Sequence, residues 1–376
     1  MKLEDLATPQ AVLDKTRLSG NLARMQARAQ ALGVALRPHL KTAKSAEVAR
    51  LATGAQQPAI TVSTTAEARY FAARDVRDIT YAVAATPGKL DALAGLRREG
   101  VEVGILVDSI EAARLVSARA GDLGCRFDVL IEIDCGAHRG GVPEGSPLIV
   151  EIGRILDAGP STRLAGVLTH AGHSYRQSTT DDIAAVAEQE RLSAVGAAAM
   201  LREAGLSCRT VSVGSTPTAL FARSLDGVTE MRPGVYMFFD RFQHHLGCCA
   251  ADDLALSVLA TVIGLRRDLG YALIDAGALA LSHDTCMAAI DGRPTYGAVF
   301  DVTGRARIGD LAVTAAHQEH GFVASASDAP DPPLPAIGTR LRIFPNHACM
   351  TAAPYAAYAV VEGDRVIGFW DKATGW

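Results

Sequence analysis

A lysine that ends an apolar segment is the first residue of this sequence that is placed to do chemistry. The run Val34–Lys41 reads as a buried strand, and Lys41 is its last residue. Burial at such a place lowers the pKa of a lysine and makes its amine nucleophilic, as a Schiff base with an aldehyde cofactor requires. The alternative is a solvated loop lysine, and Lys44, at the start of the next helical segment, fits that description better.

A turn of small residues is a second candidate, because it could bind an anion. Gly214-Ser215-Thr216 precedes a helical segment and offers backbone N–H groups and two hydroxyls, which suits a phosphate group. Gly234, followed by Val235, could complete this cradle. Gly-Ser-Thr turns are also common helix caps, and that is the alternative without a ligand.

A histidine and a cysteine two residues apart make a third candidate. If His347 and Cys349 lie on or just past a strand, their side chains face the same way and can share one metal ion. Imidazole and thiolate favour zinc or another borderline-soft divalent metal, and two protein ligands leave the open positions of a catalytic site. The alternative is a packed histidine beside a buried cysteine. We interpret three further polar clusters as structural, surface or loop residues: Cys248-Cys249, His244-His245 and Gln318–Gly321.

The elements that must position these residues alternate between strand and helix from Val34 to Asp240. Short β-rich runs are separated by Ala- and Leu-rich segments with helical spacing, which predicts βαβ units and a parallel sheet. About eight strands suit a (β/α)8 TIM-type barrel; the runner-up is an open doubly wound sheet, but no Gly-x-Gly-x-x-Gly follows the first strand. The expected strands are Val34–Lys41, Ile60–Ser63, Ile79–Val83, Val101–Asp108, Phe127–Asp134, Leu164–His170, Thr210–Gly214 and Val228–Phe239. The expected helices include Leu18–Leu32, Ser45–Thr53, Ala66–Ala73, Ile110–Ala120 and Ile183–Ala204.

The pattern changes after about residue 245, where strands follow one another without long helices. Turn residues separate them, which predicts a mostly antiparallel β-domain. We therefore expect a barrel domain over residues 8–244 and a β-domain over 245–376 together with 1–7. The expected strands of the β-domain are Leu254–Ile263, Tyr271–Asp275, Ala298–Val302, Arg340–Phe344 and Ala357–Val361.

In such a barrel the working residues lie at the C-terminal ends of the strands. Polar and Gly-rich residues do gather at that end of several expected strands, although strand ends are also polar simply because they meet loops. The residues at these ends include Lys41, Arg139, His170, Tyr175, Gly214 and Gly234.

The composition excludes several kinds of partner and compartment. The chain has 376 residues, and its 37 Lys and Arg against 41 Asp and Glu give a formal net charge of -4. A nucleic-acid or anionic-membrane partner would need a basic surplus, so we expect neither. Seven cysteines without framework spacing and an acidic N-terminus without an apolar core predict a cytoplasmic protein.

The run Arg37–Lys44 resembles the cofactor-lysine motif of the D-serine dehydratase and D-threonine aldolase family. These are fold-type III pyridoxal-phosphate enzymes, related to alanine racemase through their barrel. The resemblance extends over nearly the whole chain, from Thr8-Pro9 to Gly375-Trp376. It is strongest through Leu168–Tyr175, Val211–Ala219, Leu225–Asp240 and Pro345–Cys349.

The resemblance implies roles for individual residues. It implies that Lys41 forms the Schiff base, that His39 lies at the cofactor, and that Arg139 faces its phenolic oxygen. His170 and Tyr175 would lie about the ring, and His347 and Cys349 would hold a divalent metal, zinc or manganese. It implies a homodimer in which the β-domain of one subunit closes on the barrel of the other. The phosphate would be held by Gly214, Ser215, Thr216, Gly234 and Val235.

The reaction that the resemblance implies is dehydration of a small D-β-hydroxy-α-amino acid, D-threo-3-hydroxyaspartate or D-serine, to a 2-oxo acid and ammonia. Tyr175 or His173 is the candidate for acid–base help at the hydroxyl. The family's aldolases carry His-x-Asp where this chain has His347 and Cys349, so Cys349 favours dehydration over retro-aldol cleavage to glycine and an aldehyde. A non-catalytic cofactor-binding protein is a remote alternative. His173 departs from the small residue that relatives carry, and Arg241–His245 also differs.

Overall fold

The computed structural model describes residues 1–54, 58–285, 293–327 and 333–376. By their contacts these residues form two compact units, which are described separately. The barrel unit comprises Ala23–Gly234 and Gly375–Trp376; the β unit comprises Met1–Leu22 and Val235–Thr374. Contacts do not define folding domains, so the limits 8–244 and 245–376 with 1–7 stay a prediction.

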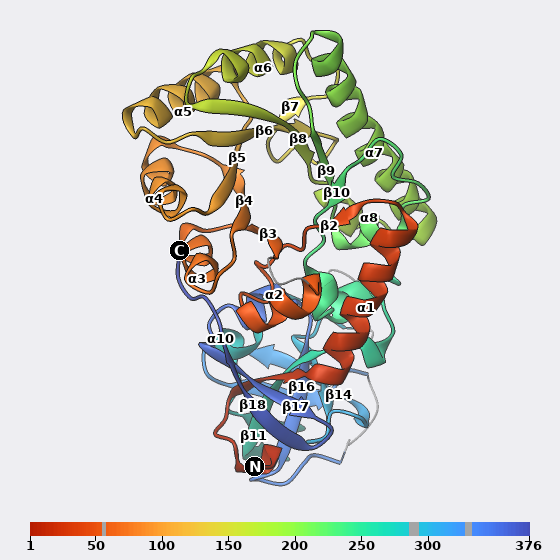
Figure 1. The fold of residues 1–376 in the computed structure, drawn as a ribbon. Coiled ribbons are helices and arrows are strands. Elements are labelled where there is room, and N and C mark those ends of the chain that lie inside the picture. The colour runs from red at the N-terminus through yellow and green to blue at the C-terminus, as the bar shows by residue number, and fades with distance from the viewer. Residues whose placement is uncertain (55–57, 286–292, 328–332) are drawn as a thin grey trace. The chain divides into compact units, whose positions relative to one another are not determined.

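The barrel unit contains eight parallel strands in a ring (Figure 1). Hydrogen bonds join each strand to the next in the order β2-β10-β9-β8-β6-β5-β4-β3. The ring closes just past β2, where Leu40 N donates to Thr61 O at 2.8 Å and Thr61 N to Pro38 O at 3.0 Å. The predicted (β/α)8 barrel is therefore confirmed. The strands are β2 (Ala35–Leu36), β3 (Ala59–Val62), β4 (Asp78–Ala84), β5 (Glu102–Val107), β6 (Phe127–Asp134), β8 (Thr162–Thr169), β9 (Thr210–Val213) and β10 (Glu230–Met231), and β7 (Val142–Pro143) pairs with β6.

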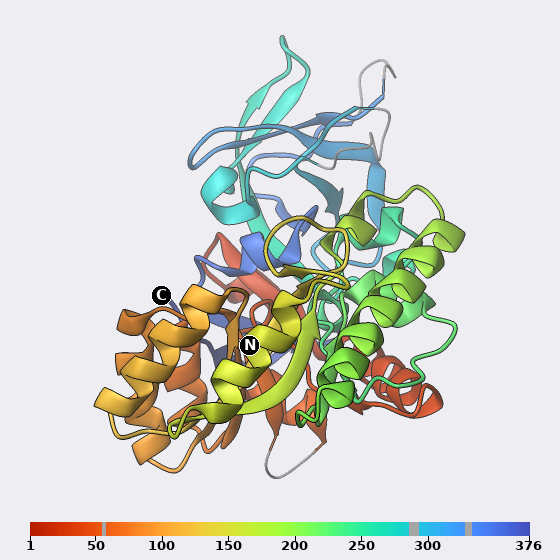
Figure 2. The same cartoon turned by 90° about the horizontal axis from the view of Figure 1, so that it is seen from above.

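Helices alternate with these strands and lie on the outside of the ring (Figure 2). Four of them begin at a residue whose hydroxyl accepts a backbone N–H: Thr64, Ser109, Thr179 and Ser215. Such caps satisfy N–H groups that have no partner within the helix, so each helix starts at a defined residue. The helices are α1 (Lys15–Ala31, which begins in the β unit), α2 (Ala46–Thr53), α3 (Thr65–Ala72), α4 (Pro87–Arg98), α5 (Ile110–Asp122), α6 (Leu148–Ala158), α7 (Thr180–Glu203) and α8 (Thr216–Phe221).

The first and last barrel strands are shorter than predicted. Val34–Lys41 was expected to be one strand, but only Ala35–Leu36 is regular; Val228–Phe239 contains only Glu230–Met231. Pro38 and Pro233 lack the N–H that a continuing ladder needs, which ends both strands. The apolar residues from 235 to 239 are buried, but they form a 3-10 turn (Val235–Met237) and its continuation rather than a strand.

The β unit contains a closed barrel of six antiparallel strands. Its strands pair in the order β11-β12-β15-β14-β13-β16, and β16 pairs again with β11. Apolar side chains such as Val258, Ile274 and Val323 fill its core. The predicted mostly antiparallel β-domain is thus confirmed. The closed strands are β11 (Leu256–Arg266), β12 (Tyr271–Ile274), β13 (Gly297–Phe300), β14 (Arg307–Ala316), β15 (Gly321–Ser325) and β16 (Arg340–Pro345). Three further strands extend from β11, namely β1 (Gln10–Asp14), β17 (Ala357–Glu362) and β18 (Arg365–Asp371).

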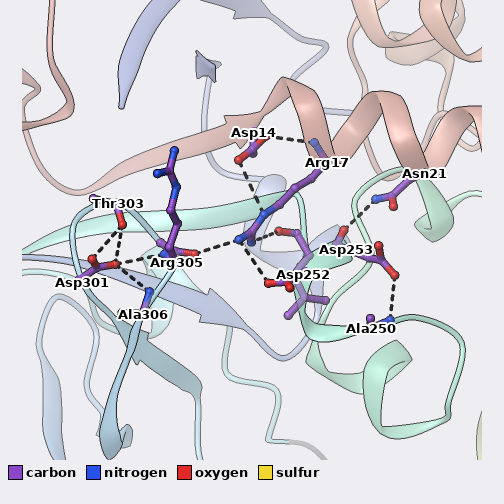
Figure 3. A network of polar contacts seen from close by, with 12 residues as sticks. Asp14, Arg17, Asn21, Ala250, Asp252, Asp253, Asp301, Thr303, Arg305 and Ala306 are labelled. Atoms are coloured by element: carbon purple, nitrogen blue, oxygen red, sulfur yellow. Dashed lines mark hydrogen bonds and ion pairs between the residues drawn. The ribbon is translucent and has the colours of Figure 1, made fainter. Parts of the chain in front are cut away.

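The N-terminal segment is fixed to the β unit by a polar network (Figure 3). The Arg17 guanidinium, in the first turn of α1, donates to Leu254 O and Gly304 O, both at 3.0 Å. Asp14 accepts from Arg17 N at 3.0 Å, while Asp301 closes the turn before β14 by accepting from Thr303 and from two backbone N–H groups. The two Arg17 bonds, together with the pairing of β1 with β11 and β17, join residues 1–22 to the second half of the chain.

No helix among the described residues has the length and hydrophobicity that crossing a bilayer would require.

Candidate active site

The predicted lysine lies at the C-terminal end of the barrel strands, next to His39. Lys41 N donates to His39 Nδ1 at 3.4 Å, and His39 Nε2 lies 3.4 Å from the Ser63 hydroxyl. Burial lowers the pKa of His39 well below its ordinary value, and the charges of Lys41 and Arg232 lower it further. The Lys41 ammonium therefore stands beside a neutral imidazole.

A second imidazole, His170, follows β8 and feels the same charges. Its Nδ1 lies 3.2 Å from the carbonyl oxygen of Gly214. Burial lowers the pKa of His170 to about 3, with further lowering by Lys41 and Arg139. Arg139 is mostly exposed and pairs with Glu132 at 3.7 Å. The structure thus brings together four of the predicted residues: His39, Lys41, Arg139 and His170.

The predicted phosphate cradle follows β9. Gly214 has a φ of +126°, and a Cβ there would lie 2.8 Å from the backbone nitrogen of Arg232, so this position requires glycine. Ser215 caps α8, with Ser215 Oγ accepting from Thr218 N at 3.3 Å and Thr218 Oγ1 accepting from Ser215 N at 3.0 Å.

The second part of the predicted cradle is Gly234 and Val235. A Cβ on Gly234 would lie 2.8 Å from His39 O, so the chain passes tightly against the segment that carries Lys41. Val235 is buried and is the first residue of the β unit's second segment.

The loop after β8 carries the two candidates for acid–base work. His173 and Tyr175 belong to a 3-10 turn, Gly172–Arg176. Both ring nitrogens of His173 are buried without a hydrogen-bond partner among the described residues. A Cβ built on Gly136 would lie 3.6 Å from His173 Cε1, so this ring packs beside the loop that follows β6. A catalytic role for either side chain stays a prediction.

The predicted metal ligands lie in the β unit, but not on a strand. His347 is the N-cap of a short helix, α11 (Ala348–Ala352), and Cys349 is its second residue, so the pair lies just past β16, one of the two expected places, but in a helix rather than an extended segment. Pro345 ends β16, and Asp240 accepts from Ala348 N at 2.9 Å, which starts the helix immediately after His347. The two side chains nevertheless meet, because His347 and Cys349 share a hydrogen bond.

His347 is also held by a carboxylate that the sequence did not indicate. Its Nδ1 lies 2.6 Å from Asp284 Oδ2. Burial alone lowers the pKa of His347, but Cys349, Asp240 and Asp284 together raise it to about 9. The imidazole is therefore protonated at neutral pH, between the sulfur of Cys349 and the carboxylate of Asp284, and a metal bound by His347 and Cys349 would displace a ring proton. Within the described ranges, no three His, Cys, Asp or Glu side chains form a preassembled metal cluster.

Two buried charged residues of the barrel were also missed. Arg232 donates to Thr169 O at 2.6 Å and to Val213 O at 3.2 Å, which ties the ends of β8 and β9 together. Glu190, on α7, accepts from the backbone N–H groups of Ala171 and Gly214. Neither residue belongs to a recognisable sequence motif. The only indication of either one in the sequence is a charged residue within an apolar segment.

The remaining polar clusters of the sequence analysis all belong to the β unit. Burial raises the pKa of the Cys248 thiol to about 12. The Nδ1 of His244 lies 2.8 Å from Cys249 O, and His244 and His245 are exposed at the end of α9 (Arg241–His245). Residues 318–320 belong to the turn between β14 and β15, and Gly321 begins β15. Asp240 caps α9 through Gln243 N at 2.8 Å.

Comparison with family models gives two matches. The alanine racemase N-terminal domain matches residues 13–242, and a serine dehydratase domain matches residues 255–361. The chain is 48% identical to D-threo-3-hydroxyaspartate dehydratase of Delftia sp. (strain HT23), over 99% of this chain and 98% of the relative. It is 30% identical to D-serine dehydratase of Dictyostelium discoideum, over 97% and 96%, and 31% identical to D-threonine aldolase of Arthrobacter sp., over 97% and 91%.

Solved structures give the same result. The structure of D-threo-3-hydroxyaspartate dehydratase from Delftia sp. HT23 superposes with a TM-score of 0.94 at 48% identity, covering 100% of both chains. A mutant of D-threo-3-hydroxyaspartate dehydratase in the metal-free form superposes with a TM-score of 0.94 at 47% identity, again over 100% of both chains.

Proposed function

This chain belongs to the family of D-hydroxyamino acid dehydratases and aldolases built on the alanine racemase N-terminal domain, and we propose that it dehydrates D-threo-3-hydroxyaspartate. The reaction gives a 2-oxo acid, oxaloacetate, and ammonia; D-serine, the second candidate substrate, gives pyruvate. The enzyme is a lyase that depends on pyridoxal phosphate and a divalent metal. The observation that carries the proposal is 48% identity to a dehydratase of this substrate over the whole chain.

Pyridoxal phosphate fits the charge of the barrel's strand ends. Lys41, Arg139 and Arg232 depress the pKa values of His39 and His170, after the larger effect of burial, so these strand ends carry positive charge in a buried place. An anionic phosphate and phenolate would be stabilised there. Lys41 would hold the cofactor, with its phosphate at Gly214, Ser215, Thr216, Gly234 and Val235.

The cofactor, when bound, delocalises the charge left when Cα loses its proton. The chain's own residues do the rest. Lys41 Nζ would remove the α-proton, and Arg139 would donate to the phenolic oxygen of the bound cofactor. His170, which is neutral and hydrogen-bonded to Gly214 O, would lie about the cofactor ring without adding charge. Tyr175 or His173 donates a proton to the departing hydroxyl.

The divalent metal fits His347 and Cys349 because one nitrogen and one sulfur already meet there. His347 Nδ1 is engaged by Asp284, which leaves Nε2 as the ligand, and the thiolate of Cys349 is the second. Zinc and manganese are the candidate metals; the soft thiolate favours zinc. The metal would supply Lewis acidity to the β-hydroxyl.

Retro-aldol cleavage is the second candidate, because the chain is also 31% identical to a D-threonine aldolase. Cys349 favours dehydration over cleavage, because the resemblance implies that the family's aldolases carry His-x-Asp where this chain has His347 and Cys349. We further propose that the chain assembles as a homodimer, which light scattering of the purified protein would test.

Product analysis tests the proposal. The purified enzyme with pyridoxal phosphate is incubated with D-threo-3-hydroxyaspartate, D-serine or D-threonine, with and without a chelator. We expect 2-oxo acid and ammonia, fastest from D-threo-3-hydroxyaspartate and lost on chelation. Glycine and an aldehyde would mean that the chain is an aldolase, and the absence of both product pairs from all three substrates would reject the proposed reaction.

A further inference from the structure

Helix α7, on the outside of the barrel, carries a glutamate, Glu190, whose side chain is buried. Glu190 is only 2% exposed, and its helical neighbours on the same side include Ala187, Ala194 and Ala197. A carboxylate in such a place is costly unless its oxygens accept hydrogen bonds. The partners of Glu190 therefore indicate what it does.

A single oxygen of Glu190 holds the beginnings of two loops. Oε1 accepts from Ala171 N at 2.9 Å and from Gly214 N at 3.0 Å, and the Thr218 hydroxyl bonds to the same carboxylate. Ala171 is the second residue after β8, and Gly214, the first after β9, begins the proposed phosphate cradle. Glu190 thus fixes both loops close to the strands that they follow.

A second link joins the same two loops further along. Ser174 Oγ lies 2.9 Å from Ser215 Oγ, and His170 Nδ1 lies 3.2 Å from Gly214 O. With Glu190 in place, the space bounded by Glu190, Gly214 and Thr218 leaves no room for a water molecule beside the carboxylate oxygen. Loss of that oxygen would leave two buried N–H groups without an acceptor, and the cradle would have to rearrange.

We infer that Glu190 is a positioning residue for the cofactor phosphate. Together with the Ser174–Ser215 bond, it holds the Gly214–Thr216 cradle in register with the loop that carries His170. This inference rests on the proposed function, because it assumes that the cradle binds the phosphate of pyridoxal phosphate. This role differs from a purely structural one in one respect. Loss of Glu190 should weaken the binding of a ligand that has a phosphate and leave unchanged the binding of a ligand that lacks it.

The test compares pyridoxal phosphate with pyridoxal as ligands of Glu190→Leu and Glu190→Gln. Leucine removes the acceptor, while glutamine keeps Oε1 for both N–H groups. Enzyme freed of cofactor is titrated with each ligand, and binding is followed by the absorbance of the Schiff base. Glu188→Leu is the matched control, since Glu188 lies two residues away on the exposed face and pairs with Arg191.

We expect Glu190→Leu to raise the Kd for pyridoxal phosphate about 10-fold or more, as two unpaired donors would require. The Kd for pyridoxal should change less than about threefold, and Glu190→Gln should stay within about threefold of the wild type for both ligands. Glu188→Leu should change neither Kd. Equal weakening of both ligands, or of neither, would overturn the inference.

Two further outcomes are distinguishable. If the wild type binds no pyridoxal phosphate, the proposed function fails and this inference fails with it. If Glu190→Leu does not fold, Ser174→Ala carries the same comparison, because it cuts the second link without removing the carboxylate. In that variant, a selective loss of pyridoxal phosphate affinity supports the inference, and unchanged affinity for both ligands rejects it.

Discussion

The imidazole Nδ1 of His170 is hydrogen-bonded to the carbonyl oxygen of Gly214, which lies 3.2 Å away. A carbonyl oxygen only accepts, so the proton of the neutral ring resides on Nδ1. Burial and the neighbouring Lys41 and Arg139 lower the pKa of His170 to about 3, which keeps the ring neutral. His170 therefore presents an unprotonated Nε2, and the same bond fixes the first residue of the cradle.

This low pKa predicts acid-sensitive stability. An unfolded histidine has a pKa of about 6.5. Between about pH 6.5 and pH 3, His170 therefore binds a proton in the unfolded chain but not in the folded one. Because the unfolded state binds more protons, the free energy of unfolding falls as the pH is lowered. We expect His170→Asn to reduce this fall, by up to about 1.4 kcal/mol per pH unit. Urea unfolding of cofactor-free protein from pH 7 to pH 4.5 measures it.

The control for this prediction is His244→Asn, because His244 is exposed and should leave the pH dependence unchanged. His39 is lowered in the same direction, so part of the acid sensitivity should remain in His170→Asn. Parallel curves for the wild type and His170→Asn would contradict the prediction.

Lys41→Ala should abolish both the Schiff-base absorbance and the reaction. We expect activity to fall by a factor of 10³ or more, on the order of the loss of a covalent catalyst and its base. Absorbance spectra with pyridoxal phosphate and 2-oxo acid assays measure the two effects. Lys89→Ala, at an exposed position of α4, should retain both. Full activity in Lys41→Ala would exclude every catalytic scheme proposed above.

The barrel could be predicted from the sequence because its strands are buried on both faces and read as short apolar runs between helical segments. Phe127–Asp134 and Ile60–Ser63 agree with β6 and β3 to within a residue. The apolar pattern failed where a buried segment is not a strand: residues 235–239 are apolar because they are buried, yet they form a turn. It also missed β14, in which Arg307, Asp310 and Thr314 interrupt the apolar residues.

The candidate site was predictable where chemistry depends on one residue type at a strand end, as for Lys41 and Gly214. Residues that act through a long-range contact left no local signal. Glu190 reads as one of many acidic residues on a helix, and Asp284 lies 63 positions before His347. Only the fold shows that each meets a predicted site residue.

Asp284 should set the metal affinity of His347. The 2.6 Å contact between Asp284 Oδ2 and His347 Nδ1 orients the ring and increases the basicity of Nε2. We expect Asp284→Asn to weaken divalent metal binding about 10- to 100-fold, the usual effect of losing such a partner. Competition with a coloured chelator measures this affinity. Asp268→Asn, whose carboxylate pairs with Arg266 on the surface, is the control. An unchanged affinity in Asp284→Asn would remove Asp284 from the metal site.

The ion pairs of Arg37 with Asp78 and Glu230 give the last prediction. Arg37 donates to Asp78 at 2.7 Å and to Glu230 at 2.8 Å, and Glu230 is buried. Burial alone raises the pKa of Glu230, but Arg37, Ser212 and Arg232 keep it low, so its charge depends on these partners. Replacing Arg37 with methionine leaves that charge with fewer partners. We expect a loss of about 3–5 kcal/mol in the free energy of unfolding.

The matched comparison is Arg163→Met, which breaks a surface pair between Arg163 and Asp128 and should cost no more than about 1 kcal/mol. Urea unfolding at pH 7 measures both variants. Because Glu230 is ionised when folded, the cost of Arg37→Met should shrink as the pH falls below the unfolded glutamate pKa of about 4.3, where protonation removes the unpaired charge. Equal costs for the two variants at pH 7 would mean that Arg232 and Ser212 alone suffice to hold the charge of Glu230.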